Sequence, residues 1–320
     1  MYDNYFVLRN GNAIPVIGFG TGIAKGISSQ PMVIVKRFIK ESIKNILDPD
    51  FKKNNKYTLA MDLKKDRSLK SISCIAVDAG CQLIDTARAY VYSESYIGQS
   101  LFGKDSKFKR EDIFIITKAT NYAQRNGTIL EEFELSLNNL KTDYVDLFLL
   151  HWPQTGTYID SWKVLEEIYE SGRAKAIGIC NCHVHHLEEL KKYAKIMPMV
   201  NELECHPLLQ QWEVREYCKK EGIQIIAHTP TGKMAKQIVE SKEMQKIAAK
   251  YGVSISQVIL RWHYQLGDIS IPNTTSEKHL KENLDIFRFS LTDEEMDEIR
   301  KLDCNYRVWP NPDNCDFTRL

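Results

Sequence analysis

The stretch Val145-Asp146-Leu147-Phe148-Leu149-Leu150-His151-Trp152-Pro153 is the most informative part of this chain of 320 residues. Residues 145–150 are apolar apart from one aspartate, which is typical of a parallel strand that is buried on both faces. An ionisable side chain, His151, follows directly at the carboxyl end of the predicted strand. Because functional residues of parallel barrels gather at that end, we expect a site close to His151.

Short apolar runs of this kind recur along the chain and alternate with amphipathic helical segments, for example at 129–140, 161–169 and 187–193. About eight repeats favour a (β/α)₈ TIM barrel over an open doubly wound sheet. The glycine run at 18–22 does not open an immediate helix, as a dinucleotide-binding turn of an open sheet would. We predict a single α/β domain over residues 1–320. Its strands are expected at 16–20, 82–85, 113–117, 145–150, 175–179, 199–200, 224–227 and 269–271.

Two segments lie outside this alternation. Residues 6–16 are expected to form an N-terminal β-hairpin cap, with Asn10-Gly11 at its turn. Residues 22–67 form a long insertion after the first strand, where a barrel loop needs only a few residues. Within it, residues 31–47 have helical spacing of apolar side chains. We expect a surface decoration at the barrel's carboxyl-terminal face, with a substrate lid or a protein-docking element as the alternative.

The composition gives the chain no strongly charged or membrane-like character. The formal net charge is +1, so there is no global case for nucleic acid or a membrane surface as partner. No apolar run approaches the roughly 20 residues that span a bilayer, and residues 1–4 have no secretory signal character. We therefore expect a cytoplasmic protein whose eight cysteines are reduced thiols.

Four polar residues stand at or just beyond the ends of successive predicted strands. Asp85 ends the second strand, Tyr90 lies in the loop beyond it, Lys118 ends the third and His151 ends the fourth. Such residues converge on one mouth of a barrel. A lysine at the end of an apolar strand is costly to bury unless a carboxylate pairs with it. Each residue alone could be structural, but together they predict a catalytic site.

Several ordered motifs narrow this prediction. They include Ile84-Asp85-Thr86-Ala87-Arg88-Ala89-Tyr90, His151-Trp152-Pro153, Gly172-Arg173-Ala174-Lys175-Ala176-Ile177-Gly178-Ile179 and Glu204-Cys205-His206-Pro207. With residues 14–21, 93–98, 110–118, 143–147 and 282–284, their order resembles the aldo-keto reductase family nearly from end to end. The excess at 22–67 lies outside the resemblance.

The resemblance implies NAD(P)H-dependent reduction of an aldehyde or ketone to an alcohol by an Asp, Tyr, Lys and His tetrad. Matched positions here are Asp85, Tyr90, Lys118 and His151. Tyr90 would be the general acid, and the Lys118 ammonium would lower its pKa. Asp85 would keep Lys118 charged, and His151 would hold the substrate oxygen together with Tyr90. Trp152 and Trp309 could line an apolar substrate pocket, although tryptophan is often simply part of the core.

The same resemblance implies a site for NADP or NAD. Its matched residues are Gly20, Thr21, Asp85, Asn181, Glu202, His228, Thr229, Asn273, Thr274, His279 and Asn283.

Several of these positions depart from the family's pattern. Family members usually place Ser-Asn, Gln and Tyr around the nicotinamide, where this chain has Cys180-Asn181, Glu202 and His228. At the adenosine 2′-phosphate they carry Lys-Ser and an Arg, where this chain has Asn273-Thr274 and His279. Loss of two cationic contacts removes roughly 1.5–3 kcal/mol each. We expect a weakened preference for NADP, toward NAD or toward poor binding of both.

One further motif, His183-Val184-His185-His186, suggests metal binding, but we expect solvated loop histidines and no metal site.

The altered nicotinamide pocket keeps other functions open. A barrel that binds nicotinamide nucleotides or scaffolds a partner, with little turnover, is the main alternative, and an isomerase or lyase on a remodelled pocket is another. For partners, we expect a small carbonyl substrate, no nucleic acid and no membrane, with a protein partner at residues 22–67 as an open option. The sequence carries no code for which carbonyl compound is bound.

Overall fold

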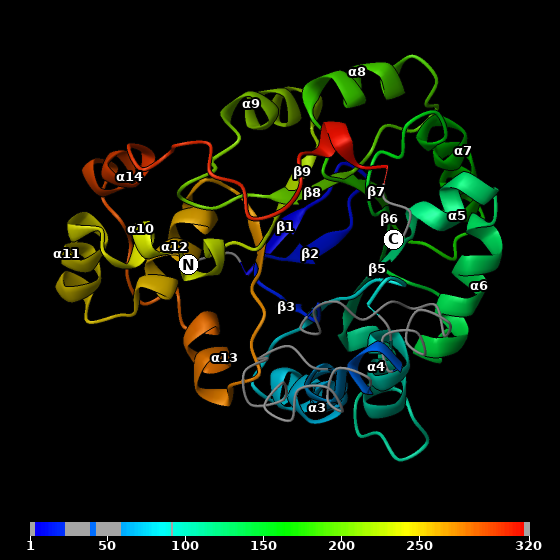
Figure 1. Ribbon diagram of the computed structural model, residues 1–320, viewed down its shortest axis with the longest axis horizontal. Coiled ribbons are helices and arrows are strands. Elements are labelled where there is room, and N and C mark those ends of the chain that lie inside the picture. Colours follow the sequence, from blue (N-terminus) through cyan, green and yellow to red (C-terminus); the bar gives the residue numbers. More distant parts are fainter. Residues whose placement is uncertain (1–3, 23–38, 43–58, 91, 317–320) are drawn as a thin grey trace.

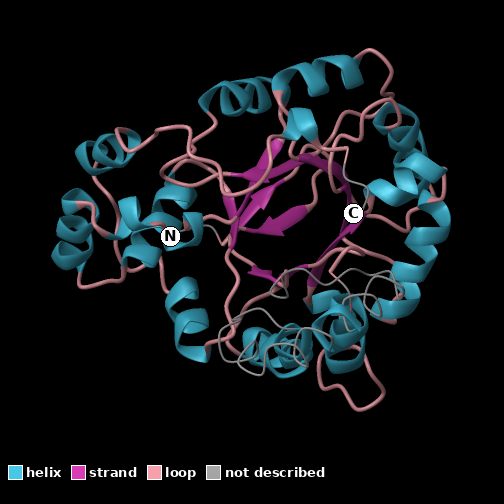
Figure 2. Cartoon of the chain, viewed as in Figure 1, coloured by secondary structure: helices cyan, strands magenta, loops and turns pink. Residues whose placement is uncertain are grey.

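The computed structural model describes residues 4–22, 39–42, 59–90 and 92–316. Its main sheet has eight parallel strands in consecutive order, which confirms the predicted TIM barrel. Figure 2 shows the strands at the centre and the helices around them. The strands are β3 (Phe19–Gly20), β4 (Leu83–Asp85), β5 (Phe114–Ala119), β6 (Leu147–Leu150), β7 (Ile177–Cys180), β8 (Val200–Glu204), β9 (Gln224–His228) and β10 (Ile269–Ile271).

The barrel closes between its first and last strands. Ile17 forms a parallel bridge with Ser270, and the Gly18 amide donates a 2.8 Å hydrogen bond to the Ser270 carbonyl. The Gly20 amide donates a further bond of 3.0 Å to the Pro272 carbonyl. Every residue of β6 is buried, as its apolar sequence predicted. Closure brings the carboxyl ends of all the strands to one mouth.

Helices ring the barrel (Figure 1), and the predicted segment 129–140 is a helix over those same residues. The segment predicted at 187–193 begins earlier, because His183 and His186 form a capping box at its start. The helices are α3 (Leu59–Asp78), α4 (Ser93–Leu101), α5 (Asn121–Asn126), α6 (Ile129–Leu140), α7 (Tyr158–Glu170), α8 (Val184–Lys191), α9 (Trp212–Glu221), α10 (Lys236–Val239), α11 (Lys242–Tyr251), α12 (Ile255–Gln265), α13 (Glu277–Leu284) and α14 (Asp293–Arg300), with short 3₁₀ turns η1 (Arg110–Asp112), η2 (Gly232–Met234) and η3 (Pro312–Asn314).

The predicted N-terminal hairpin is confirmed as β1 (Tyr5–Val7) paired with β2 (Ala13–Pro15). Asn12 Nδ2 donates a 2.6 Å hydrogen bond to the Lys175 carbonyl, and the Tyr5 hydroxyl bonds the side chain of Gln82. Lys175 and Gln82 both precede strands of the barrel. The hairpin therefore covers the amino-terminal end of the barrel and leaves the opposite mouth to the site.

Part of the insertion at 22–67 can be placed. Its last residues belong to α3, which packs against α4 and α13, and residues 39–42 are helical. The rest of the helix predicted at 31–47 lies outside the described residues, so the expected lid or docking role stays a prediction. In the described part of the chain, no helix has the length and apolar character needed to cross a membrane.

Candidate active site

Lys118 lies at the centre of the site and has no exposed surface. Its Nζ forms an ion pair with Asp85 and donates a 3.0 Å hydrogen bond to the Thr86 carbonyl. Glu202 Oε1, from β8, lies 3.3 Å from the same nitrogen. The ion pair of Lys118 with Asp85 was expected from the sequence. Glu202 was expected only to contact the cofactor, so its contact with Lys118 was not predicted.

One buried ammonium therefore faces two buried carboxyl groups. Burial raises the pKa of Glu202 to about 8, and the Asp85 carboxylate adds to the rise while Lys118 opposes it. Burial by itself would lower the pKa of Lys118, but Asp85 and Glu202 outweigh it and hold that pKa well above its ordinary value. Since Asp85 makes the closer contact, it is the ionised partner of Lys118. At neutral pH Glu202 is mostly protonated, and a side-chain hydrogen bond with Asp85 adds to the rise of its pKa.

Tyr90 and His151 lie in front of Lys118. The Lys118 nitrogen is 5.4 Å from the centre of the Tyr90 ring, and the rings of Tyr90 and His151 meet edge to face with centroids 5.6 Å apart. Burial raises the pKa of Tyr90, with Asp85 and Glu202 adding to it and Lys118 opposing it. Lys118 thus acts in the expected direction, but the expected net lowering is wrong, because burial outweighs it.

His151 is neutral at physiological pH. Burial lowers its pKa well below the ordinary value, and the charge of Lys118 lowers it further. Its Nδ1 is buried without a hydrogen-bond partner among the residues that the structure describes. A neutral imidazole has one N–H to donate, so His151 can hold an oxygen atom but holds no extra proton to give away.

A cavity of about 370 Å³ opens in front of these side chains and collects most of the predicted residues. It shares five lining residues with a neighbouring cavity of about 380 Å³, so the two form one elongated channel. The first cavity is lined by Gly20, Gly22, Asp85, Tyr90, His151, Trp152, Asn181, Glu202, His228, Thr229, Ile271, Asn273, Trp309 and Pro310.

Other predicted cofactor residues lie elsewhere. Thr274 lines the second cavity. Thr21 is buried behind the site, where its hydroxyl donates a 2.8 Å hydrogen bond to the Asp85 carbonyl. His279 is exposed on α13, and Asn283 Oδ1 accepts a 3.3 Å bond from Ser256. Neither of these last two is among the described residues that line the channel.

A directed chain of hydrogen bonds crosses the pocket wall. Asn181 Nδ2 donates to the His151 carbonyl at 3.2 Å, and Asn181 Oδ1 lies 2.9 Å from His228 Nε2. Since burial lowers the pKa of His228 to about 4, the ring is neutral and Nε2 carries its proton. Nδ1 is then the acceptor for the Thr229 hydroxyl at 3.3 Å, and Thr229 in turn accepts a 2.8 Å bond from Trp309 Nε1.

The carboxyl-terminal tail completes the pocket, where Trp309 lines the cavity as the sequence suggested, but the hydrogen bonds of the tail were not predicted. The backbone amides of Val308 and Trp309 donate hydrogen bonds of 2.6 and 3.0 Å to the Glu204 carboxylate. Burial alone would raise the pKa of Glu204, but His206 and these amides outweigh it and lower that pKa. Glu204 stands in the motif Glu204-Cys205-His206-Pro207, which gives no sign by itself of a tail contact.

This geometry agrees with the comparisons with known proteins. The model of the aldo/keto reductase family matches residues 62–303, which is most of the chain. The chain belongs to this family. The aldo-keto reductase is 45% identical over 242 residues to glyoxal reductase of Bacillus subtilis, covering 76% of this chain and 86% of that protein. It is 35% identical over 242 residues to the methylglyoxal reductase DkgA of Escherichia coli, covering 74% and 86%.

Solved structures of other aldo-keto reductases have the same fold. MGS-M4, from a Medee basin deep-sea metagenome library, superposes with a TM-score of 0.79 at 32% identity, over 98% of this chain and all of that one. An aldo-keto reductase of the silkworm Bombyx mori, complexed with NADPH, gives a TM-score of 0.76 at 27% identity, over 96% of this chain and 89% of that one.

Two groups of residues in the aldo-keto reductase have the composition of metal ligands. Cys205, His263 and Asp268 are buried together. Arg215 donates two hydrogen bonds to the Asp268 carboxylate, so its guanidinium already neutralises the charge that a metal ion would. The other group contains the predicted histidine motif together with Asp313 of η3. The expectation of solvated histidines is wrong for two of the three, since His183 and His186 side chains are 18% and 12% exposed.

Proposed function

We propose that this aldo-keto reductase reduces small aldehydes or ketones to alcohols, using NADPH or NADH as the hydride donor. The observation that carries the proposal is that Tyr90 and His151 face one cavity while the Lys118–Asp85 pair lies directly behind them. The related glyoxal and methylglyoxal reductases favour dicarbonyl compounds as the first substrates to test.

The roles of the two donors follow from their protonation. A substrate oxygen between Tyr90 and His151 would accept a hydrogen bond from each. His151 is neutral with a low pKa, so it positions the oxygen and does not supply the proton. Tyr90 keeps its proton until negative charge develops on that oxygen, and then transfers it. The nearby Lys118 ammonium stabilises the phenolate that remains.

The channel fits a long dinucleotide. A bound nicotinamide cofactor would supply the hydride to the substrate carbonyl carbon. Gly20 lines this channel and has no room for a larger residue, because a Cβ there would lie 2.8 Å from the Ile271 carbonyl oxygen. Protonated Glu202 offers an O–H and a carbonyl oxygen, the same pair of functions that an amide side chain would present to a carboxamide.

The phosphate end of the channel supports a weakened preference for NADP. Lys278 and Lys281 on α13 are paired with Glu282 and Glu277 at 3.7 and 2.8 Å, which reduces their use as phosphate ligands. Lys233 lines the second cavity together with Thr274, and its Nζ lies 4.0 Å from the centre of the Trp309 ring. We assign the phosphate contact to Lys233 because of this place on the channel, whereas the family carries its cations near Asn273-Thr274 and His279.

Replacement of Tyr90 by phenylalanine tests the proposal. We expect kcat for methylglyoxal to fall by about 10²–10⁴, the range for loss of a general acid. Binding of NADPH, followed by tryptophan quenching, should change little because the ring remains. Unchanged turnover would refute the role of Tyr90. Absence of nucleotide binding in the unmodified protein would favour the scaffold function instead.

A cytoplasmic location and a protein partner at residues 22–67 remain expectations from the sequence.

A further inference from the structure

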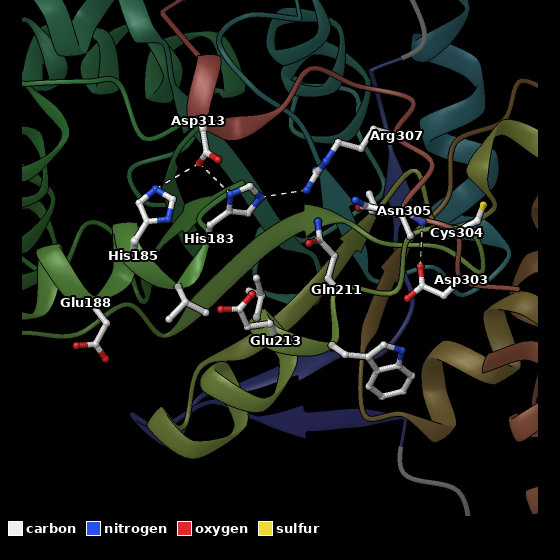
Figure 3. A pocket seen from close by; sticks show the side chains of 14 residues that line it. His183, His185, Glu188, Gln211, Glu213, Asp303, Cys304, Asn305, Arg307 and Asp313 are labelled. Atoms are coloured by element: carbon white, nitrogen blue, oxygen red, sulfur yellow. Dashed lines mark hydrogen bonds and ion pairs between the residues drawn. The ribbon is translucent and has the colours of Figure 1, made fainter. Parts of the chain in front are cut away.

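Three imidazoles and one carboxylate meet outside the active-site cavity, where the chain passes from β7 to α8. His183, His185 and His186 come from the start of α8, and Asp313 comes from η3 in the tail. Figure 3 shows His183 and His185 facing Asp313. Asp313 Oδ1 lies 2.9 Å from His183 Nδ1, 3.3 Å from His185 Nε2 and 3.8 Å from His186 Nε2. All four donor atoms lie within 4.8 Å of one another.

We propose that these residues bind a divalent transition-metal ion such as Zn²⁺, with His183, His185 and Asp313 as the main ligands and His186 as the fourth. Imidazole nitrogens and one carboxylate are a ligand set typical of zinc. With bonds of about 2.1 Å, tetrahedral ligands lie about 3.4 Å apart. The three distances to Asp313 lie close to that value, so small side-chain movements suffice.

Access and charge also suit a cation. His183, His185 and Asp313 border a groove of about 950 Å³ that other described residues of α8, α9 and the tail line, and the side chain of His185 is 64% exposed. Asp313 supplies one carboxylate to the group, and the three imidazoles supply nitrogen donors.

Two hydrogen bonds compete with the metal. Arg307 Nη2 donates to His183 Nε2 at 3.0 Å, which keeps the ring proton on Nδ1, facing Asp313. Ligation through Nδ1 moves that proton to Nε2, where it would face the Arg307 donor, so the guanidinium must turn away into the groove. His186 Nδ1 accepts a 3.1 Å hydrogen bond from the His183 amide. If His186 binds the metal through Nε2, its ring proton must lie on Nδ1, so this hydrogen bond would also break. His186 is therefore the weakest of the four ligands, and Arg307 lowers the affinity of the site.

Metal binding would tie the tail to α8. The same tail carries Val308 and Trp309, whose amides bond Glu204, and Trp309 heads the hydrogen-bond chain that ends at His151. The bound ion would thus hold one wall of the active-site cavity in place. The site itself does not depend on the proposed carbonyl reduction.

The test is calorimetric titration of the chelator-treated, full-length protein with Zn²⁺. We expect one ion per chain, and a loss of affinity of about tenfold or more in Asp313→Asn and in His185→Ala. Arg307→Gln should tighten binding. When the metal binds Nδ1 of His183, the ring proton is on Nε2, and the glutamine side-chain oxygen can accept a hydrogen bond from this N–H. Cys304→Ser is the matched control, since Cys304 lines the same groove and is exposed.

A second measurement reports on the tail. Zn²⁺ should slow hydrogen exchange at the Val308 and Trp309 amides in the unmodified protein and not in Asp313→Asn. Affinity that is unchanged in Asp313→Asn and His185→Ala would overturn the proposal, as would loss of binding in Cys304→Ser. Zinc binding of the expected stoichiometry without any effect on the tail amides would overturn the link to the active-site wall.

Discussion

Protonation of Glu202 should control the affinity for NADPH. Its carboxyl group lines the cavity, and burial beside Asp85 raises its pKa to about 8. The neutral acid can donate to a carboxamide oxygen, whereas the carboxylate cannot and adds a second negative charge beside Asp85. We therefore expect NADPH binding to weaken as pH rises through about 8.

The size of the effect follows from the fraction of neutral Glu202. With a pKa of about 8, about 90% is neutral at pH 7 and about 10% at pH 9, so the apparent Kd should rise about tenfold. Glu202→Gln keeps the size and a hydrogen-bond donor, with an N–H in place of the O–H, but does not titrate. Its Kd should therefore stay nearly constant between pH 7 and pH 9. Glu216→Gln, which removes an exposed carboxylate from α9, is the control and should behave like the unmodified protein.

Stability gives a second readout of the same group. Because the folded-state pKa is raised, the folded protein holds a proton on Glu202 that the unfolded chain releases above about pH 4.5. Its stabilising contribution is complete below that pH and is lost as pH rises toward about 8, with a slope of up to about 1.4 kcal/mol per pH unit. Urea unfolding of Glu202→Gln should lack this slope. Equal pH dependence of Kd in both proteins would refute the reasoning.

Three further substitutions test other parts of the molecule. Lys233→Met should weaken NADPH binding about fivefold, because an exposed charge-assisted phosphate contact contributes about 1 kcal/mol; fluorescence titration that finds no change would remove Lys233 from the phosphate site. Glu204→Gln replaces the carboxylate that accepts hydrogen bonds from the Val308 and Trp309 amides with a neutral amide, which weakens both bonds. Hydrogen exchange at these two amides should therefore be faster, and KM should rise. Unchanged exchange would contradict the assigned contact. Gly98→Ala would place a Cβ 2.1 Å from the Asn139 carbonyl oxygen, so urea unfolding should show a loss of about 1–3 kcal/mol, and a loss below about 0.5 kcal/mol would contradict the close packing of α4 on α6.

Local patterns in the sequence predicted the framework of the fold. The apolar run of β6 and the helical spacing of α6 depend on neighbours along the chain, and both elements were placed close to their observed bounds. Barrel topology then brought Asp85 and Lys118 together, because they end adjacent strands. The contact of Glu202 with Lys118 was missed because β8 is not a neighbour of β5, so it depends on side-chain reach across the barrel.

Contacts of irregular segments were beyond sequence reasoning. Trp309 reaches Thr229, and Asp313 reaches His183, from a tail that has no helical or strand periodicity to predict its path. The sign of the Tyr90 shift failed for a related reason. It depends on how deeply the ring is buried and on Glu202, and neither was known before the fold was assembled.

The residues that depart from the expected cofactor-binding pattern of the family depend on one another. A tyrosine in place of His228 would have one polar group at its tip, whereas the imidazole has two and connects the Thr229 hydroxyl with Asn181. Burial of His228 keeps it neutral, which gives this chain of bonds one direction from Trp309 to the His151 carbonyl. Glu202, in turn, is held protonated beside the Lys118–Asp85 pair and can replace an amide. The hydrogen bonds that run from Trp309 to the His151 carbonyl connect Thr229, His228 and Asn181 beside the predicted tetrad. This connection favours a working reductase over a scaffold that has lost its cofactor.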